Sequence, residues 1–458
     1  MQFISIYFLI FIVLLCICVK WTGNINIQNR IFFIANIVFY GSWNVKCLIL
    51  LLAIVLVVYI CGILYEKIKT TTPVICSVVV CVSVLGVFKY CNFFVESFSR
   101  LFNIENIKTL NLILPLGLSF YIFQAISYIV DVKRGAIPAE KSFTKLAAYL
   151  MFFAQITAGP IVKARDFLPQ LNRKHHITKE NVYAGMQQIL LGITKKYVIS
   201  DRIRGTVDAV YSMPKAFDGI SISWAIIGYS IQIYCDFSGY SDMAIGIAKI
   251  LDFDLGRNFD LPYLAENAQD FWRRWHISLS SWFKEYVYIP LGGSREGNVK
   301  TYRNLMITML LSGLWHGANW KYVIWGGTHG VYSVLEKIGK TNGKSISIIS
   351  RIVRGIITFT IVSILWVLFR ADNMSASLEI VSGLIRATGI RYISVYTVIF
   401  TIVVFAWEII SYVKNDGHEI IPNMDLDIFR NRVIICFWWL MCICFAYVGN
   451  STFVYAQF

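Results

Sequence analysis

Long apolar runs recur along the whole chain, and they constrain its fold more than any other feature. A helix needs about 20 mostly apolar residues to cross the hydrocarbon core of a bilayer. Because some of the runs are short or broken, we expect about 11 true spans, with the remainder re-entrant or interfacial. The candidate spans are 3–19, 29–42, 46–65, 72–90, 110–130, 145–161, 185–201, 221–250, 303–319, 321–337, 350–369, 393–413 and 432–452.

These runs predict an all-α polytopic membrane protein. Backbone polar groups cannot stay unpaired in lipid, and the runs are too long and too uniformly apolar for the alternating strands of a β-barrel. The composition agrees, since 57% of residues are hydrophobic and 15% are charged, against about 45–50% and about 25% in soluble domains. No linker, repeat or low-complexity tract divides the chain, so we predict one membrane domain over residues 1–458.

The first apolar run, 3–19, has no basic segment before it and no small-residue cleavage site after it. It therefore differs from a secretory signal peptide. Lys20 and Trp21 follow it and are typical of an anchor at the membrane interface. We expect a retained first helix with its N-terminus outside the cell.

The net charge of +15 lies in the polar stretches between the apolar runs. Lys and Arg concentrate in 131–145, 162–184 and 252–303, which the positive-inside rule places in the cytoplasm. A nucleic-acid partner is not expected, because basic patches on a polar chain would then carry the charge. An acidic cytosolic partner or an anionic lipid surface is compatible with this topology.

The 11 cysteines predict neither a disulfide framework nor a metal or redox site. Most lie inside apolar runs, and no CxxC pair occurs. Cysteines in such positions act as small hydrophobic residues.

The segment 268–290 carries aromatic side chains at helical spacing, with charged residues between them. This pattern predicts a helix lying in the membrane interface. Gly292, Gly293 and Gly297 follow directly and predict a sharp turn, beyond which a buried polar cavity is expected to begin.

Six histidines occur, and His316 is the strongest candidate for chemistry. It ends the apolar run 303–319, where a titratable ring is costly unless it faces a cavity or a partner. Gly313, Gly317 and Ala318 would let another group approach closely. Ser312 and Asn319 share its helix face and could orient the imidazole. The alternative is a core histidine satisfied by a carbonyl or a hydroxyl.

The other histidines have simpler interpretations. His175, His176 and His418 lie in polar loops, where solvated rings are expected. His276 lies in the aromatic interfacial segment, and His329 lies in an apolar run.

A histidine with an ordinary pKa of about 6.5 can accept a proton at neutral pH. A hydroxyl that attacks an acyl thioester needs such a base, because its proton must be removed as the new bond forms. A serine acyl-enzyme is disfavoured because GxSxG is absent, and HExxH and Walker A sequences are also absent.

Two acidic residues lie inside an apolar run, Asp236 and Asp242. A carboxylate there costs about 2.5–3.5 kcal/mol on insertion scales. They either join helices around the break at Ser238 and Gly239, with Asp236 and Tyr240 spaced for a hydrogen bond, or line a cavity as proton sites. The structural interpretation is preferred.

Several longer motifs resemble the membrane-bound O-acyltransferases, in the bacterial branch that acetylates alginate or transfers D-alanine to teichoic acid. Within that branch, 127–131 and 156–162 are more similar to the alginate type. The motifs that carry the resemblance are PLGLSFYIFQAISYIVDVKRG (115–135), AQITAGPIVKARDFLPQL (154–171), IYCDFSGYSDMAIGIA (233–248), FWRRWHISLSSWFKEYVYIP (271–290) and GLWHGANWKYVIWGGTHG (313–330).

The resemblance, most diagnostic over 110–335, implies a ring of tilted helices around a central channel in the bacterial cytoplasmic membrane. It implies acetyl transfer from a cytosolic donor, expected to be acetyl-CoA, to hydroxyls of an extracytoplasmic polysaccharide such as an alginate-like polymer or peptidoglycan. It assigns His316 as the catalytic histidine and His276 as a second important one, while His329 is expected to pack. No bound cofactor or metal is expected, and an extracytoplasmic SGNH-type acetyltransferase is an expected partner.

Three alternatives remain open from the sequence. The first is D-alanyl transfer to teichoic acid. The second is a proton-coupled transporter using Asp236, Asp242 and His316, although the paired halves typical of such transporters are not visible. The third is an inactive scaffold for a secretion complex, which the intact His316 disfavours.

Overall fold

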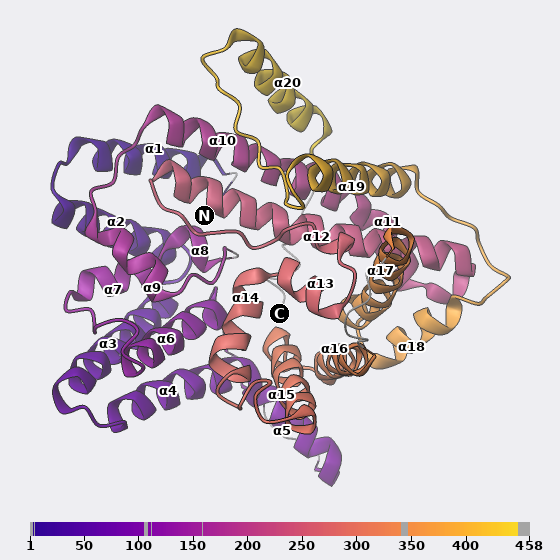
Figure 1. The fold of residues 1–458 in the computed structure, drawn as a ribbon, viewed down its shortest axis with the longest axis horizontal. Helices are drawn as coiled ribbons and strands as arrows, with labels where there is room; N and C mark the ends of the chain where they lie inside the picture. Colours follow the sequence, from indigo (N-terminus) through magenta and orange to yellow (C-terminus); the bar gives the residue numbers. More distant parts are fainter. Residues whose placement is uncertain are drawn as a thin grey trace. The chain divides into compact units, whose positions relative to one another are not determined.

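Helices form nearly all of the regular structure in the computed structural model (Figure 1). An isolated β-bridge between Phe217 and Ile390 is the exception within the described part of the chain. The all-α prediction is therefore confirmed. The structure describes residues 3, 5–104, 109–110, 112–157, 159–339 and 347–447.

The helices of the first half are short in several places. They are α1 (Ile6–Trp21), α2 (Ile25–Gly41), α3 (Val45–Ile68), α4 (Thr72–Leu85), η1 (Gly86–Tyr90), α5 (Cys91–Phe102), α6 (Leu118–Lys133), α7 (Phe143–Leu150), α8 (Phe153–Ile156), α9 (Ala164–Phe167), η2 (Leu168–Asn172), α10 (Lys179–Ile193), η3 (Thr194–Ser200) and α11 (Asp201–Ser212).

The second half begins after the turn η4 (Pro214–Ala216) with the longest helix, α12 (Gly219–Ile250). It continues with η5 (Pro262–Leu264), α13 (Ala268–Arg274), α14 (Ile277–Phe283), η6 (Lys284–Tyr288), α15 (Asn298–His316), α16 (Trp320–Ile338), α17 (Ile348–Arg370), α18 (Met374–Gly383), α19 (Val395–Lys414) and α20 (Phe429–Phe445).

Four helical segments within the described residues are long and apolar enough to cross a membrane: α3, Thr72–Phe102, α17 and α19. Shorter apolar helices occur at Ile6–Trp21 and Phe143–Ile156. Together they are typical of a multi-pass membrane protein. The expected number of about 11 spans, some of them short or re-entrant, stays a prediction.

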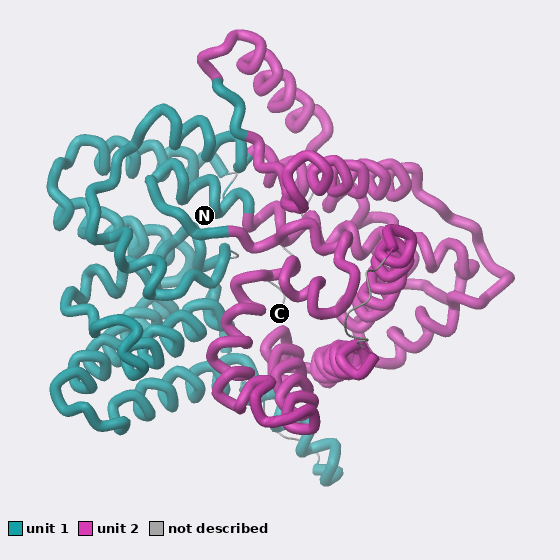
Figure 2. Tube along the Cα trace, viewed as in Figure 1, with its two compact units in different colours: residues 1–189, 242–256, 423–425 teal, residues 190–241, 257–422, 426–458 magenta. Residues whose placement is uncertain are grey.

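Two compact units make up the described chain, and each is discontinuous in sequence (Figure 2). Unit 1 contains residues 1–189, 242–256 and 423–425, and unit 2 contains residues 190–241, 257–422 and 426–458. Helices α10 and α12 therefore contribute residues to both units. The single-domain prediction stays a prediction.

In unit 1, the predicted span 145–161 is a broken helix, with α7 and α8 separated at Met151 and Phe152. A break exposes backbone groups that lipid cannot satisfy. Asn36 of α2 supplies partners: its Oδ1 accepts from the Phe153 N–H at 3.0 Å, and its Nδ2 donates to the Ala148 carbonyl at 3.2 Å. A buried amide in an apolar helix thus stabilises the interruption.

In unit 2, α10 runs through the π-helix η3 into α11 without a loop. The wide turn of η3 carries Lys196, which is fully buried. Its ammonium donates to Asp201 at 2.9 Å and to Asp236 on α12. Gly239 lies against this turn, because a Cβ there would come within 2.7 Å of the Gly192 carbonyl oxygen. A buried charge cluster therefore fastens η3 to α12.

Candidate active site

The two helices that carry the WHG motif cross at glycines. A Cβ on Gly313 of α15 would lie 2.2 Å from the Tyr322 carbonyl oxygen, and a Cβ on Gly326 of α16 would lie 2.2 Å from the Met309 carbonyl oxygen. Small residues at such positions allow backbones to approach closely. The prediction that small neighbours of His316 admit another group is confirmed, and the group is α16.

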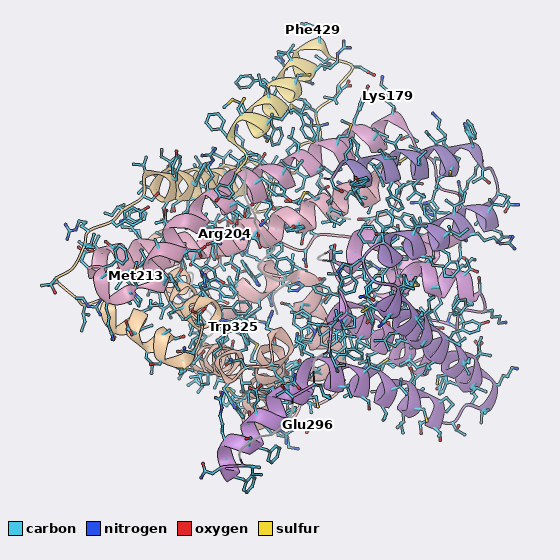
Figure 3. The ribbon with its side chains drawn as sticks, turned by 180° about the vertical axis from the view of Figure 1, so that it is seen from behind. Lys179, Arg204, Met213, Glu296, Trp325 and Phe429 are labelled. Atoms are coloured by element: carbon cyan, nitrogen blue, oxygen red, sulfur yellow. The ribbon has the colours of Figure 1, made fainter. Side chains whose placement is uncertain are left out.

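His316 is the last residue of α15 and is 2% exposed. Its ring lies edge-on to three aromatic rings: Trp315 at 4.9 Å, Trp325 of α16 at 5.1 Å and Phe369 of α17 at 5.2 Å between centroids. Trp325 is labelled in Figure 3. Three helices thus hold the imidazole in a cage of aromatic rings.

Asn319 and Ser312, which were expected to orient the His316 ring, each have another contact in the structure. Their role in orienting the imidazole stays a prediction. The Asn319 side-chain oxygen Oδ1 caps α16 by accepting from the Lys321 N–H at 3.0 Å. Ser312, one turn before His316 on α15, lines a cavity.

His276 interrupts the predicted interfacial helix, so the prediction of one continuous helix over 268–290 is wrong. The segment is divided into α13, α14 and the π-helix η6. His276 itself takes the left-handed conformation at φ 43°, which is uncommon for a residue with a Cβ and concentrates at functional sites. The predicted sharp turn that follows is confirmed by positive φ at Gly292, Gly293 and Gly297.

The irregular segment before α13, which contains Asn258 and Asp260, explains why the helix is interrupted. The Ile277 N–H donates to the Asn258 carbonyl at 2.8 Å, and the Asp260 N–H donates to the Arg274 carbonyl at 2.9 Å. These tertiary hydrogen bonds replace helical ones on both sides of His276. Its ring is fully buried, and burial lowers the pKa of His276 to about 3, so the imidazole is neutral.

The two candidate histidines share an aromatic neighbour. The Trp315 ring lies 4.9 Å from the His316 ring and 6.2 Å from the His276 ring. Phe237 of α12 packs edge-on against His276 at 4.7 Å. The structure therefore brings His316 and His276, which are 40 residues apart in the sequence, next to the same indole ring.

A cavity of about 830 Å³ in unit 2 lies beside this pair. Ile277, adjacent to His276, lines it, and so does Ser312, one turn from His316. Trp272 also lines it and contacts Trp325 at 5.7 Å, which in turn contacts His316. Neither histidine is itself a lining residue, and each has a lining residue within one helical turn of it in the sequence.

Basic side chains line the same cavity. Arg273 and Lys284, both from the segment 268–290, are among them. Arg274 is not, because it pairs with Asp270 at 3.0 Å. Lys337 and Arg354 also line the cavity. No sequence motif pointed to them, since they belong to α16 and α17, outside the segment 268–290.

His329 packs within the aromatic cluster, in agreement with the expectation. It is fully buried on α16, and its ring lies 4.8 Å from Trp325 and 5.1 Å from Trp272.

His175 departs from its prediction as a solvated loop residue, since it is 2% exposed. Its ring stacks on Phe253 at 4.1 Å, and its backbone exchanges two hydrogen bonds with the Gln28 amide. These tertiary contacts bury His175, although its neighbours in the loop of unit 1 are polar. His176 and His418 are exposed, as expected.

The two acidic residues have structural partners. Asp236 pairs with Lys196, and Asp242 accepts from Gln188 at 3.3 Å. Neither lines the cavity described above. These contacts favour the interpretation of both residues as links between helices.

Comparison with known proteins identifies the family. The model of the membrane-bound O-acyltransferase family matches residues 132–378, which include His276 and His316. The probable alginate O-acetylase AlgI of Azotobacter vinelandii is 37% identical over 82% of this chain and 76% of its own length. The peptidoglycan O-acetyltransferase of Helicobacter pylori is 36% identical over 78% of this chain and 73% of its own length. The teichoic acid D-alanyltransferase of Bacillus subtilis is 29% identical over 50% of this chain and 62% of its own length. The chain is therefore an O-acyltransferase and belongs to the membrane-bound O-acyltransferase family.

Proposed function

We propose that this protein moves acetyl groups from acetyl-CoA in the cytosol to hydroxyls of an extracytoplasmic polysaccharide. The observation that carries the proposal is the cavity of about 830 Å³, which basic residues line together with Ile277, next to His276, and Ser312, one turn before His316. Arg273, Lys284 and Arg354 are exposed members of that lining. They suit the phosphates of a donor, while the apolar wall near Trp272 suits its acyl end.

In the proposed reaction the acceptor hydroxyl attacks the thioester carbonyl carbon, and His316 accepts the hydroxyl proton. The carbon–sulfur bond breaks, and the departing thiolate takes that proton from His316. The products are an acetyl ester and a free thiol. A base in this position typically contributes about 10²–10⁴-fold to the rate. His276, whose ring lies 6.2 Å from that of Trp315, assists the same transfer.

The polymer and the route of the acetyl group belong to the proposal as well. The acceptor is an alginate-like exopolysaccharide or peptidoglycan, reached directly or through an SGNH-type acetyltransferase outside the membrane. The protein lies in the cytoplasmic membrane, with the basic stretches 131–145, 162–184 and 252–303 in the cytosol. A ring of tilted helices around a central channel would let the donor and acceptor meet from opposite sides.

Mass spectrometry of surface glycans from a deletion strain tests the function. We expect the ester-linked acetyl groups of one polymer to disappear and to return when the intact gene is supplied. Loss of D-alanine from teichoic acid instead would establish the second candidate, which the similarity to the Bacillus subtilis protein supports over half of the chain. Unchanged acetyl and D-alanine contents would refute both.

Removing the charge at the cavity lining tests the donor site. We expect Arg273→Ala/Lys284→Ala to raise the KM for acetyl-CoA while kcat changes little, because these exposed cations contribute to donor binding alone. Exposed ion pairs are worth about 0.2–1 kcal/mol each, so the expected rise in KM is severalfold, and it should shrink at high salt. Initial rates in membrane vesicles at several salt concentrations provide the measurement.

Lys300→Ala is the matched control for this charge loss. Lys300 is an exposed cation on α15 that pairs with Glu296 at 2.9 Å and does not line the cavity. Its removal should leave the KM for acetyl-CoA unchanged. An equal KM shift in both variants, or no shift in either, would argue against a donor site in this cavity.

A further inference from the structure

Asn258 lies against the His276 ring and contacts several polar groups around it. The Asn258 Oδ1 is 3.1 Å from His276 Nδ1, 2.8 Å from the Ser278 hydroxyl and 3.4 Å from the Ser278 N–H. Its Nδ2 donates to the Ser241 hydroxyl of α12 at 3.0 Å. The side chain is 1% exposed. All of these residues belong to unit 2.

The orientation of the Asn258 amide follows from its neighbours. A backbone N–H can only donate, so the atom that faces the Ser278 N–H must be the amide oxygen, and the nitrogen must face Ser241. An amide oxygen can only accept, so the neutral His276 ring must carry its proton on Nδ1. Nε2 is then the basic nitrogen of the ring.

We infer that Asn258 is a positioning residue for the acyl transfer: it holds the His276 ring and fixes the tautomer in which Nε2 can accept a hydrogen bond from a substrate. The inference rests on the proposed function. Two further features agree with it. The main-chain bond from Ile277 to the Asn258 carbonyl ties the same two segments together, and the left-handed conformation of His276 is kept by these bonds.

A histidine acting as a hydrogen-bond acceptor needs its neutral form, so its surroundings set the pH range of activity. The rings of Phe237, Phe259 and Trp315 surround it, and burial lowers its pKa. The elements packed around it carry several titratable groups. They include Asp236, paired with Lys196; Asp242, bonded to Gln188; Asp260, paired with Arg257 and His418; Arg274, paired with Asp270; Arg273; Lys249; and His316.

The test compares Asn258→Ala and Asn258→Asp with the wild-type protein in membrane vesicles, using acetyl-CoA as donor and deacetylated polymer from the deletion strain as acceptor. We expect Asn258→Ala to lower kcat about 10- to 100-fold, part of the about 10²–10⁴-fold that a base contributes. The KM for acetyl-CoA should stay near the wild-type value, because Asn258 does not line the cavity.

Asn258→Asp should restore much of the rate and also move the pH profile. The carboxylate still accepts from Nδ1, but its charge favours the protonated imidazole and so raises the pKa of His276. Since protonated His276 is inactive, the acidic limb of the profile should shift to higher pH. This readout remains valid even if Asn258→Ala fails to fold.

Asn304→Ala is the structural control. Asn304 is an equally buried asparagine of unit 2, and its Nδ2 donates to the Gly293 carbonyl at 3.0 Å. Its loss should lower the amount of folded protein without moving the pH profile. The inference is overturned if Asn258→Ala keeps the wild-type kcat per folded molecule, or if Asn258→Asp leaves the acidic limb in place. Wild-type vesicles that transfer no acetyl group would overturn the proposed function itself, and this inference with it.

Discussion

His316→Gln and His316→Ala should both abolish measurable acetylation of the polymer while the protein stays in the membrane. The general base is lost in each variant, which corresponds to a fall of about 10²–10⁴-fold in rate. Gln keeps much of the side-chain volume inside the cage formed by Trp315, Trp325 and Phe369. It therefore separates the loss of the base from the loss of packing. The measurement is the acetyl content of the polymer per unit of membrane-inserted protein.

His329→Phe is the matched control for these variants. His329 lies on α16 in the same aromatic cluster, is fully buried and packs on Trp325 and Trp272. A phenyl ring of similar size should preserve both packing and acetylation. Retained acetylation in His316→Gln would remove His316 from the mechanism. If His329→Phe loses as much acetylation as His316→Gln, the loss reflects disturbed packing of the aromatic cluster rather than the missing base.

Lys196→Met should have the largest effect on stability. Lys196 and its partners Asp201 and Asp236 have no exposed side-chain surface. Removing the cation takes the shared counter-ion from both buried carboxylates, and Arg204 still lies 3.5 Å from Asp201. Breaking a buried ion pair in this way costs about 3–5 kcal/mol. We expect less folded protein after detergent extraction and a clearly lower melting temperature, measured by size-exclusion profiles at increasing temperature.

The triple variant Lys196→Met/Asp201→Asn/Asp236→Asn separates charge from packing. With all three charges removed, no carboxylate remains unpaired, and much of the lost stability should return. If the triple variant is as unstable as Lys196→Met, packing at the wide turn of η3 is the cause. A wild-type melting temperature in Lys196→Met would show that the cluster contributes little to the fold.

The amino-acid sequence by itself determined that this protein lies in a bilayer and that its regular structure is helical. Apolar runs of about 20 residues must form helices in lipid, because their backbone polar groups need partners within the segment. The bounds of α3, α17 and α19 differ from the predicted ones by three residues or fewer. His316 was also identifiable, because a titratable ring at the end of an apolar run is costly unless it has a use. Such features depend on neighbours along one helix, which a sequence displays directly.

Only the tertiary structure decided what surrounds these residues. The helix predicted over 268–290 ends at His276, because the Asn258 segment supplies hydrogen bonds that compete with helical ones. Likewise, Lys196 meets Asp236 across 40 residues, and Lys337 and Arg354 come to one cavity from different helices. Helical periodicity reports which residues share a face but not which face it will meet. Partners that arrive from distant segments were therefore invisible until the chain was folded.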